Sequence, residues 1–216
     1  MHDFLNEVYG KIINKSDIDI VRILDYMIES YNEFEPNWHA LGFIHCKILK
    51  NDSGTLRLHI WHAQEKHADE QVEKIHDHLF SLNSFIISGK IKNEFFNVEK
   101  TNKNDFTHYA YIVKYIDEGS YLTSSENFYN VCKLNEKTIV PGEYYTIDSS
   151  EFHRSSLANG ISTLTLVATY NHLEKDPLTL SSKELESCKI RKASPYNKDK
   201  WRDILINFRK EITIKK

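Results

Sequence analysis

The chain has 216 residues, of which 40% are hydrophobic, and its formal net charge is −3. This length and composition fit one globular domain with appendages, and the lack of a basic surplus argues against a nucleic-acid partner. The three cysteines, Cys46, Cys132 and Cys188, are too few and too widely spaced for a disulfide framework.

The first 36 residues predict helices. Apolar residues follow a helical period in two stretches, one over residues 4–13 and the other over residues 20–28. The segment 16–19 between them supplies an N-cap signal with acidic residues for the second helix. Pro36 ends the helical pattern, so we expect a helical segment over residues 1–36 that packs on the rest of the chain.

From about Trp38 the sequence changes to short segments rich in β-branched and aromatic residues. Apolar and polar residues alternate over 56–61, which predicts a half-buried strand. Gly89 marks a turn, and we expect the segment 90–98 to form a hairpin with the strand before it. The strands predicted besides 56–61 are 84–88, 108–115, 128–134, 144–147 and 162–169.

Many short strands with regular turn signals favour a β-sandwich or a β-barrel. We place this barrel at residues 37–175 and a C-terminal extension at residues 176–216. Within the extension, apolar residues share one face of a helical pattern over residues 198–212. The sequence therefore predicts a mainly β fold with helices at both ends.

The most informative motif is Ile75-His76-Asp77-His78. Residues i and i+2 of a strand point to the same side of a sheet, so the two imidazoles can bind one metal. His153 would complete a set of three from a later strand-like segment. Such a set, with open coordination positions, suits Fe, Cu, Ni or Zn. Asp77 must point the other way, and we expect it to have a structural role.

The spacing of these histidines resembles the two motifs of the cupin superfamily. The histidine pair precedes Gly89 by about eleven positions, and the turn Pro141-Gly142 precedes His153 by a similar interval. The glutamate that usually follows the pair is absent, since Leu82 and Asn83 stand at the corresponding places. The resemblance therefore implies a metal site made of three histidines without a carboxylate.

The order of further motifs resembles bacterial cysteine dioxygenases, which belong to the thiol dioxygenases. The likeness is remote and covers about residues 20–170. It lies in Glu29-Ser30-Tyr31, Trp38, Leu58-His59-Ile60-Trp61, Ile75-His76-Asp77-His78, Gly89 and Phe152-His153-Arg154. The resemblance implies an RmlC-like jelly-roll barrel with a mononuclear Fe(II) centre held by His76, His78 and His153.

The substrate pocket departs from this family. Its Ser-x-His-x-Tyr triad is replaced by Thr163-x-Thr165-x-Val167, and its carboxylate-binding arginine corresponds to Lys47, which cannot bind a carboxylate in bidentate fashion. We therefore expect that free cysteine is not the substrate. No catalytic acid or base is assigned. The residues expected to contact the substrate are Lys47, Arg57, His59, Thr163, Thr165, Val167 and Arg154.

The sequence thus predicts an enzyme, a non-haem Fe(II) dioxygenase of cupin fold. Its substrates would be dioxygen and a small metal-chelating thiol, amine or carboxylate. Zn, Ni, Mn and Cu remain alternative metals. Two other functions stay open: a non-catalytic cupin that binds a metal or a metabolite, and a metal-independent sugar epimerase or isomerase. Because no signal peptide or membrane-spanning run is evident, we expect a cytoplasmic monomer or homodimer without membrane partners.

Overall fold

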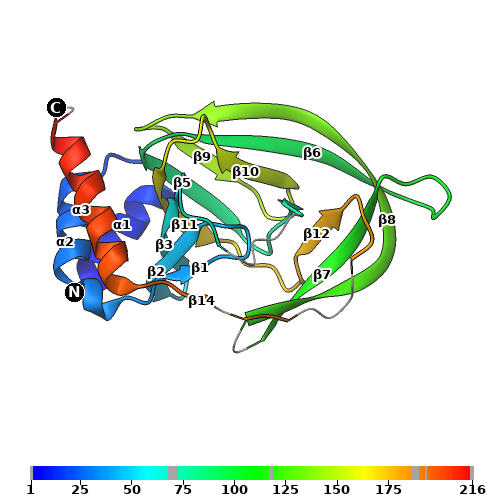
Figure 1. The fold of residues 1–216 in the computed structure, drawn as a ribbon, viewed down its shortest axis with the longest axis horizontal. Helices are drawn as coiled ribbons and strands as arrows, with labels where there is room; N and C mark the ends of the chain where they lie inside the picture. The colour runs from blue at the N-terminus through cyan, green and yellow to red at the C-terminus, as the bar shows by residue number, and fades with distance from the viewer. Residues whose placement is uncertain (1, 68–72, 117–118, 186–189, 193, 215–216) are drawn as a thin grey trace.

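The computed structural model describes residues 2–67, 73–116, 119–185, 190–192 and 194–214, so Cys188 lies outside the described residues. Two antiparallel seven-stranded sheets face each other, and three α-helices group on one side of them (Figure 1). This is the architecture of a jelly-roll barrel, and it confirms the predicted mainly β fold. None of the helices in the described ranges combines the length and apolar character needed to cross a bilayer.

The first sheet carries the helices. Its strands, in spatial order, are β14 (Ser194–Pro195), β1 (Asn37–Trp38), β2 (Ile44–Asn51), β3 (Gly54–Trp61), β11 (Thr163–Tyr170), β5 (Ser81–Ser88) and β9 (Tyr144–Ile147). The helices are α1 (His2–Ile13), α2 (Ile20–Glu29) and α3 (Lys198–Ile214). A 3₁₀ turn, Tyr31–Glu33, follows α2.

The second sheet forms the opposite wall. Its strands, in spatial order, are β13 (Ile190–Lys192), β8 (Gly119–Ile139), β6 (Ile91–Thr101), β10 (His153–Leu157), β4 (Ile75–His76), β12 (Leu178–Ser181) and β7 (His108–Ile116). Because β7 pairs with both β12 and β8, the second sheet closes on itself. The long strands β6 and β8 arch together over the barrel (Figure 1).

The main core lies between the first sheet and the helices. Leu56, Leu58 and Ile60 of β3 are fully buried there, together with Trp201 of α3. Asp19 caps α2 by accepting a hydrogen bond from a backbone N–H, as the segment before that helix predicts. Since successive strand residues point to opposite faces, the alternate residues of β3 turn toward the barrel interior.

Asn83 anchors α1 to the sheet. From β5, its amide nitrogen donates to the carbonyl oxygen of Ile13 at 2.9 Å, and its oxygen accepts from the Thr146 hydroxyl at 2.8 Å. The last carbonyl groups of a helix lack partners within the helix. Asn83, which the sequence comparison set at the place of a cupin glutamate, therefore has a structural role on the outer face of the sheet.

Replacing Asn83 by alanine is expected to lower the free energy of unfolding by about 1–3 kcal/mol, because a buried helix end loses its partner. Urea denaturation measures this loss. Tyr144→Phe is the control, since the Tyr144 hydroxyl donates to the Ser16 carbonyl at an exposed site. We expect the control to lose less than about 1 kcal/mol. Equal losses for the two variants would contradict the anchoring role.

The expected hairpin of 84–88 with 90–98 is wrong. β5 pairs with β11 and β9 in the first sheet, whereas β6 pairs with β10 and β8 in the second. Gly89 is the corner at which the chain passes from one sheet to the other. The strands also continue past residue 175, because β12 returns to pair with β4.

Candidate metal centre

Three histidines converge on the second sheet. His76 ends β4, His78 follows two residues later, and His153 begins β10 directly opposite His76. The ring centroids are 4.8 Å apart for His76 and His78, 4.4 Å for His76 and His153, and 4.9 Å for His78 and His153. One ligand nitrogen from each ring lies within 4.8 Å of the others.

Backbone carbonyls fix the orientation of two of these rings. His76 Nδ1 lies 2.9 Å from the carbonyl oxygen of Lys74, and His153 Nδ1 lies 3.1 Å from that of Glu151. A carbonyl oxygen only accepts hydrogen bonds, so each Nδ1 carries the proton. The Nε2 lone pairs are then free for a metal, and the hydrogen bonds hold the rings as outer-shell partners do in metalloproteins.

The environment keeps the three rings neutral. Burial lowers the pKa of His76 and holds the pKa values of His78 and His153 well below the ordinary range, and the neighbouring rings add to this effect for His78 and His153. His153 is only 2% exposed. Neutral imidazole is the form that binds a metal, so the donor set fits a divalent transition metal.

No carboxylate joins this group among the described residues. Leu82 packs in an apolar cluster with Phe80. Asp77, between His76 and His78, is 3% exposed and points away, forming an ion pair with Lys175 at 2.6 Å and accepting from the Leu178 N–H at 2.6 Å. Asp77 thus ties the segment before β12 to the strand that carries His76 and His78.

Arg57 lies near the histidines on the interior face of β3. Its Nε donates to the Thr55 hydroxyl at 2.9 Å, and its guanidinium lies 5.0 Å from the centre of the Phe80 ring. Phe80 in turn stacks on His78 with 4.9 Å between ring centres. Burial lowers the pKa of Arg57, but an arginine stays charged in proteins. A fixed positive charge therefore borders the site.

The other predicted substrate residues divide by position. Thr165 and Val167 of β11 pair with His59 and Arg57 of β3, and cross-strand partners share a face, so they belong to the interior wall. Val167 packs with the apolar cluster around Phe80. The hydroxyl of Thr165 is buried without a partner among the described residues.

Three predicted residues are placed less favourably for contact with a substrate. The Thr163 hydroxyl accepts a hydrogen bond from the Lys90 N–H and donates one to the Lys90 carbonyl oxygen. Lys47 is opposite Arg57 on β2, but its side chain is exposed. Arg154 follows His153 on the opposite face of β10, where it forms an ion pair with Glu94 at 2.6 Å.

Sequence reasoning missed His39, His45 and Phe43. His45 and His59 are cross-strand partners on β2 and β3, and Phe43 packs against both His39 and His59. His45 lies between the buried residues Ile44 and Cys46. This alternation would have indicated an interior-facing position only once the pairing of the two strands was known.

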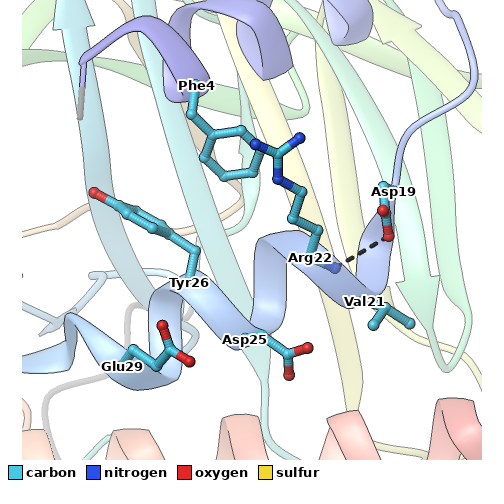
Figure 2. Close-up of a pocket in the computed structure, with 7 residues that line it drawn as sticks. All are labelled: Phe4, Asp19, Val21, Arg22, Asp25, Tyr26 and Glu29. Atoms are coloured by element: carbon cyan, nitrogen blue, oxygen red, sulfur yellow. Dashed lines mark hydrogen bonds between the residues drawn. The ribbon is translucent and has the colours of Figure 1, made fainter.

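A surface hollow of about 460 Å³ runs along α2, away from the three histidines (Figure 2). Two of its acidic groups have partners within the helical layer: Asp19 accepts from the backbone of Arg22, and Asp25 forms an ion pair with Arg209, whereas the Tyr26 hydroxyl has no hydrogen-bond partner among the described residues. The Arg22 guanidinium lies 4.5 Å from the centre of the Phe4 ring. The hollow is therefore a solvated helix surface, and the three histidines remain the candidate site.

The sequence matches no protein-family model and no curated protein. Among solved structures, the chain is similar to hydroquinone 1,2-dioxygenase PnpCD in complex with Cd²⁺ and 4-hydroxybenzonitrile. The TM-score is 0.35 at 10% sequence identity, and the match covers 57% of this chain and 61% of that one. A likeness this distant carries no functional argument, so function is argued from the site itself.

Proposed function

We propose that the protein is a mononuclear, metal-dependent oxygenase of cupin type, with His76, His78 and His153 as its ligands and Fe(II) as its metal. The observation that carries this proposal is the convergence of three neutral imidazoles, without a carboxylate among the described residues, between the two sheets. Three ligands leave positions open, as catalytic metal sites do.

Bound there, Fe(II) would supply coordination positions for a chelating substrate and for dioxygen. The three imidazoles are neutral and therefore offset none of the metal's charge, which favours an anionic substrate. Arg57 would hold a second anionic or polar group of that substrate, and Phe80 would form the apolar surface between Arg57 and His78. The substrate class is a small molecule with a metal-binding thiolate, amine or carboxylate.

Free cysteine remains outside this proposal. Thr165 and Val167 face the interior where the thiol dioxygenases carry a histidine and a tyrosine, and neither side chain can transfer a proton near neutral pH. The protein is first loaded with Fe(II) under anaerobic conditions. The test then measures its consumption of oxygen after air-saturated buffer and a probe are added. Cysteine, 3-mercaptopropionate and catechol serve as probes, with the His153→Ala variant as the blank.

Turnover of a probe other than cysteine, lost in the blank, would support the proposal. Rapid conversion of cysteine to its sulfinate would contradict the exclusion of free cysteine as the substrate. Tight binding of one metal ion, with no oxygen consumption for any probe, would instead favour a metal-binding cupin without catalysis. That second candidate is favoured by the lack of a proton-transferring side chain at the interior positions of Thr165 and Val167 on β11.

Arg57→Met is expected to raise the KM for an anionic probe about 10–100-fold, because it removes a charge-assisted hydrogen bond of roughly 1.5–3 kcal/mol. Initial-rate kinetics measure this change. Lys47→Met is the matched control. Lys47 is the cross-strand neighbour of Arg57, but its side chain is exposed. A larger increase in KM from Lys47→Met than from Arg57→Met would show that Lys47, and not Arg57, anchors the substrate.

A further inference from the structure

A second group of histidines lies outside the proposed ligand set. His45 and His59 face each other across β2 and β3 with ring centres 6.5 Å apart, and His39 approaches His45 to 5.4 Å from the turn after β1. Phe43 stacks on His39 at 4.4 Å and contacts His59 at 4.7 Å. We call His39, His45 and His59 the histidine wall.

His39 is the opposite tautomer to His76 and His153. Its Nδ1 accepts a hydrogen bond from the Leu41 N–H at 3.2 Å, so the proton of the neutral ring resides on Nε2. A neutral ring protonated on Nε2 and already accepting at Nδ1 has no lone pair left for a metal. His39 therefore presents an N–H donor, whereas His76 and His153 present lone pairs.

Ring nitrogens of the other two wall residues remain available. The structure records no hydrogen bond between a ring nitrogen of His45 or His59 and another described residue. The fully buried hydroxyl of Thr165, cross-strand from His59, is likewise without a partner in the described part of the chain. Buried polar groups are ordinarily hydrogen-bonded, so the Thr165 hydroxyl indicates a polar ligand or water inside the barrel. The half-buried rings of His45 and His59 have nitrogens free to bind the same ligand.

The charge at this place is positive. Arg57 lies one alternate position from His59 on the same face of β3, and no described carboxylate forms an ion pair with it. Asp77 and Glu94, the buried acids of the second sheet, are taken by Lys175 and Arg154. A largely buried charge ordinarily has a partner of opposite charge, whereas the contacts of Arg57 within the described residues are the Thr55 hydroxyl and the Phe80 ring.

We propose that the histidine wall and Arg57 form an oxyanion subsite, in which imidazole N–H groups and the guanidinium bind the oxygen atoms of a carboxylate or phosphate. Only one part of this proposal rests on the proposed function, namely that the bound oxyanion belongs to the substrate. The substrate would then have two functional ends, one at the metal and one at the wall. The wall's neutral imidazoles donate hydrogen bonds without adding charge.

The tautomers can be measured directly. In full-length protein labelled with ¹⁵N-histidine, we expect His39 to be protonated on Nε2, and His76 and His153 on Nδ1. Single variants assign the signals. Protonation of His39 on Nδ1 would overturn the donor role without any bearing on metal binding.

The ligand is tested with malonate and inorganic phosphate as separate probes, with and without Zn(II). We expect the His39 and His59 signals to shift in the metal-free protein, and His59→Gln and His39→Phe each to weaken binding at least tenfold. The preferred probe distinguishes a carboxylate from a phosphate ligand. His108→Gln, on β7 with its ring bonded to Thr107, is the control.

The outcomes separate the two proposals. Metal binding with no shift in the wall signals, or with shifts confined to the three metal-centre histidines, would reject the oxyanion subsite and leave the oxygenase proposal standing. Anion-dependent shifts in a protein that binds no metal would reject the oxygenase and support the subsite. Because the wild-type spectrum carries the main observation, a variant that fails to fold does not remove the test.

Discussion

Replacing His153 by alanine is expected to reduce the bound metal from about one equivalent to almost none. The variant leaves two imidazoles, from the single segment of His76 and His78, and removes the ligand that comes from β10. Loss of an outer hydrogen-bond partner alone costs roughly 10–100-fold in metal affinity, so loss of a ligand costs more. Elemental analysis of protein dialysed against metal-free buffer measures the stoichiometry.

His67→Ala is the matched control. His67 precedes the histidine pair in sequence, but its ring lies 5.4 Å from that of Trp38 and is not part of the three-histidine group. This variant should retain a full equivalent of metal. Retention of the metal in His153→Ala, or its loss in His67→Ala, would show that the ligand set is wrong.

The histidine pair could be predicted because its geometry is local. Side chains two positions apart on an extended backbone point to the same side, whatever the rest of the fold is. Placing His153 beside them required the spacing of a second motif. The histidine wall needed more, because His45 and His59 meet only through the register of two strands. A single sequence does not specify that register.

Two errors in the predicted fold have similar causes. Every residue of β5 is buried, so this strand lacks the alternation that would have shown which of its faces meets which layer. Proximity to Gly89 then favoured a hairpin with the next strand, although the two belong to different sheets. The short strand β12 was missed because four residues carry little periodicity, and only its pairing with β4 identifies it.

The corner between the sheets leads to the largest expected effect on stability. Gly89 has φ of +78°, and a Cβ atom there would lie 2.2 Å from the Thr163 hydroxyl and 2.4 Å from the Ser162 carbonyl oxygen. Gly89→Ala therefore adds a clash with backbone, about 1–3 kcal/mol by overpacking, to the roughly 1–2 kcal/mol of left-handed strain. We expect urea denaturation to show a loss of about 3 kcal/mol or more.

Gly142→Ala separates the two contributions. Gly142 has φ of +88°, similar to that of Gly89, but no atom lies within 4 Å of an added Cβ. Its variant should lose only the strain, about 1–2 kcal/mol. The difference between the variants then measures how tightly the crossing packs on Thr163, the residue whose hydroxyl is bonded to Lys90 beside the corner. Equal losses would mean that the corner relaxes around the added methyl group, and the packing of the crossing on Thr163 would then add nothing measurable to stability.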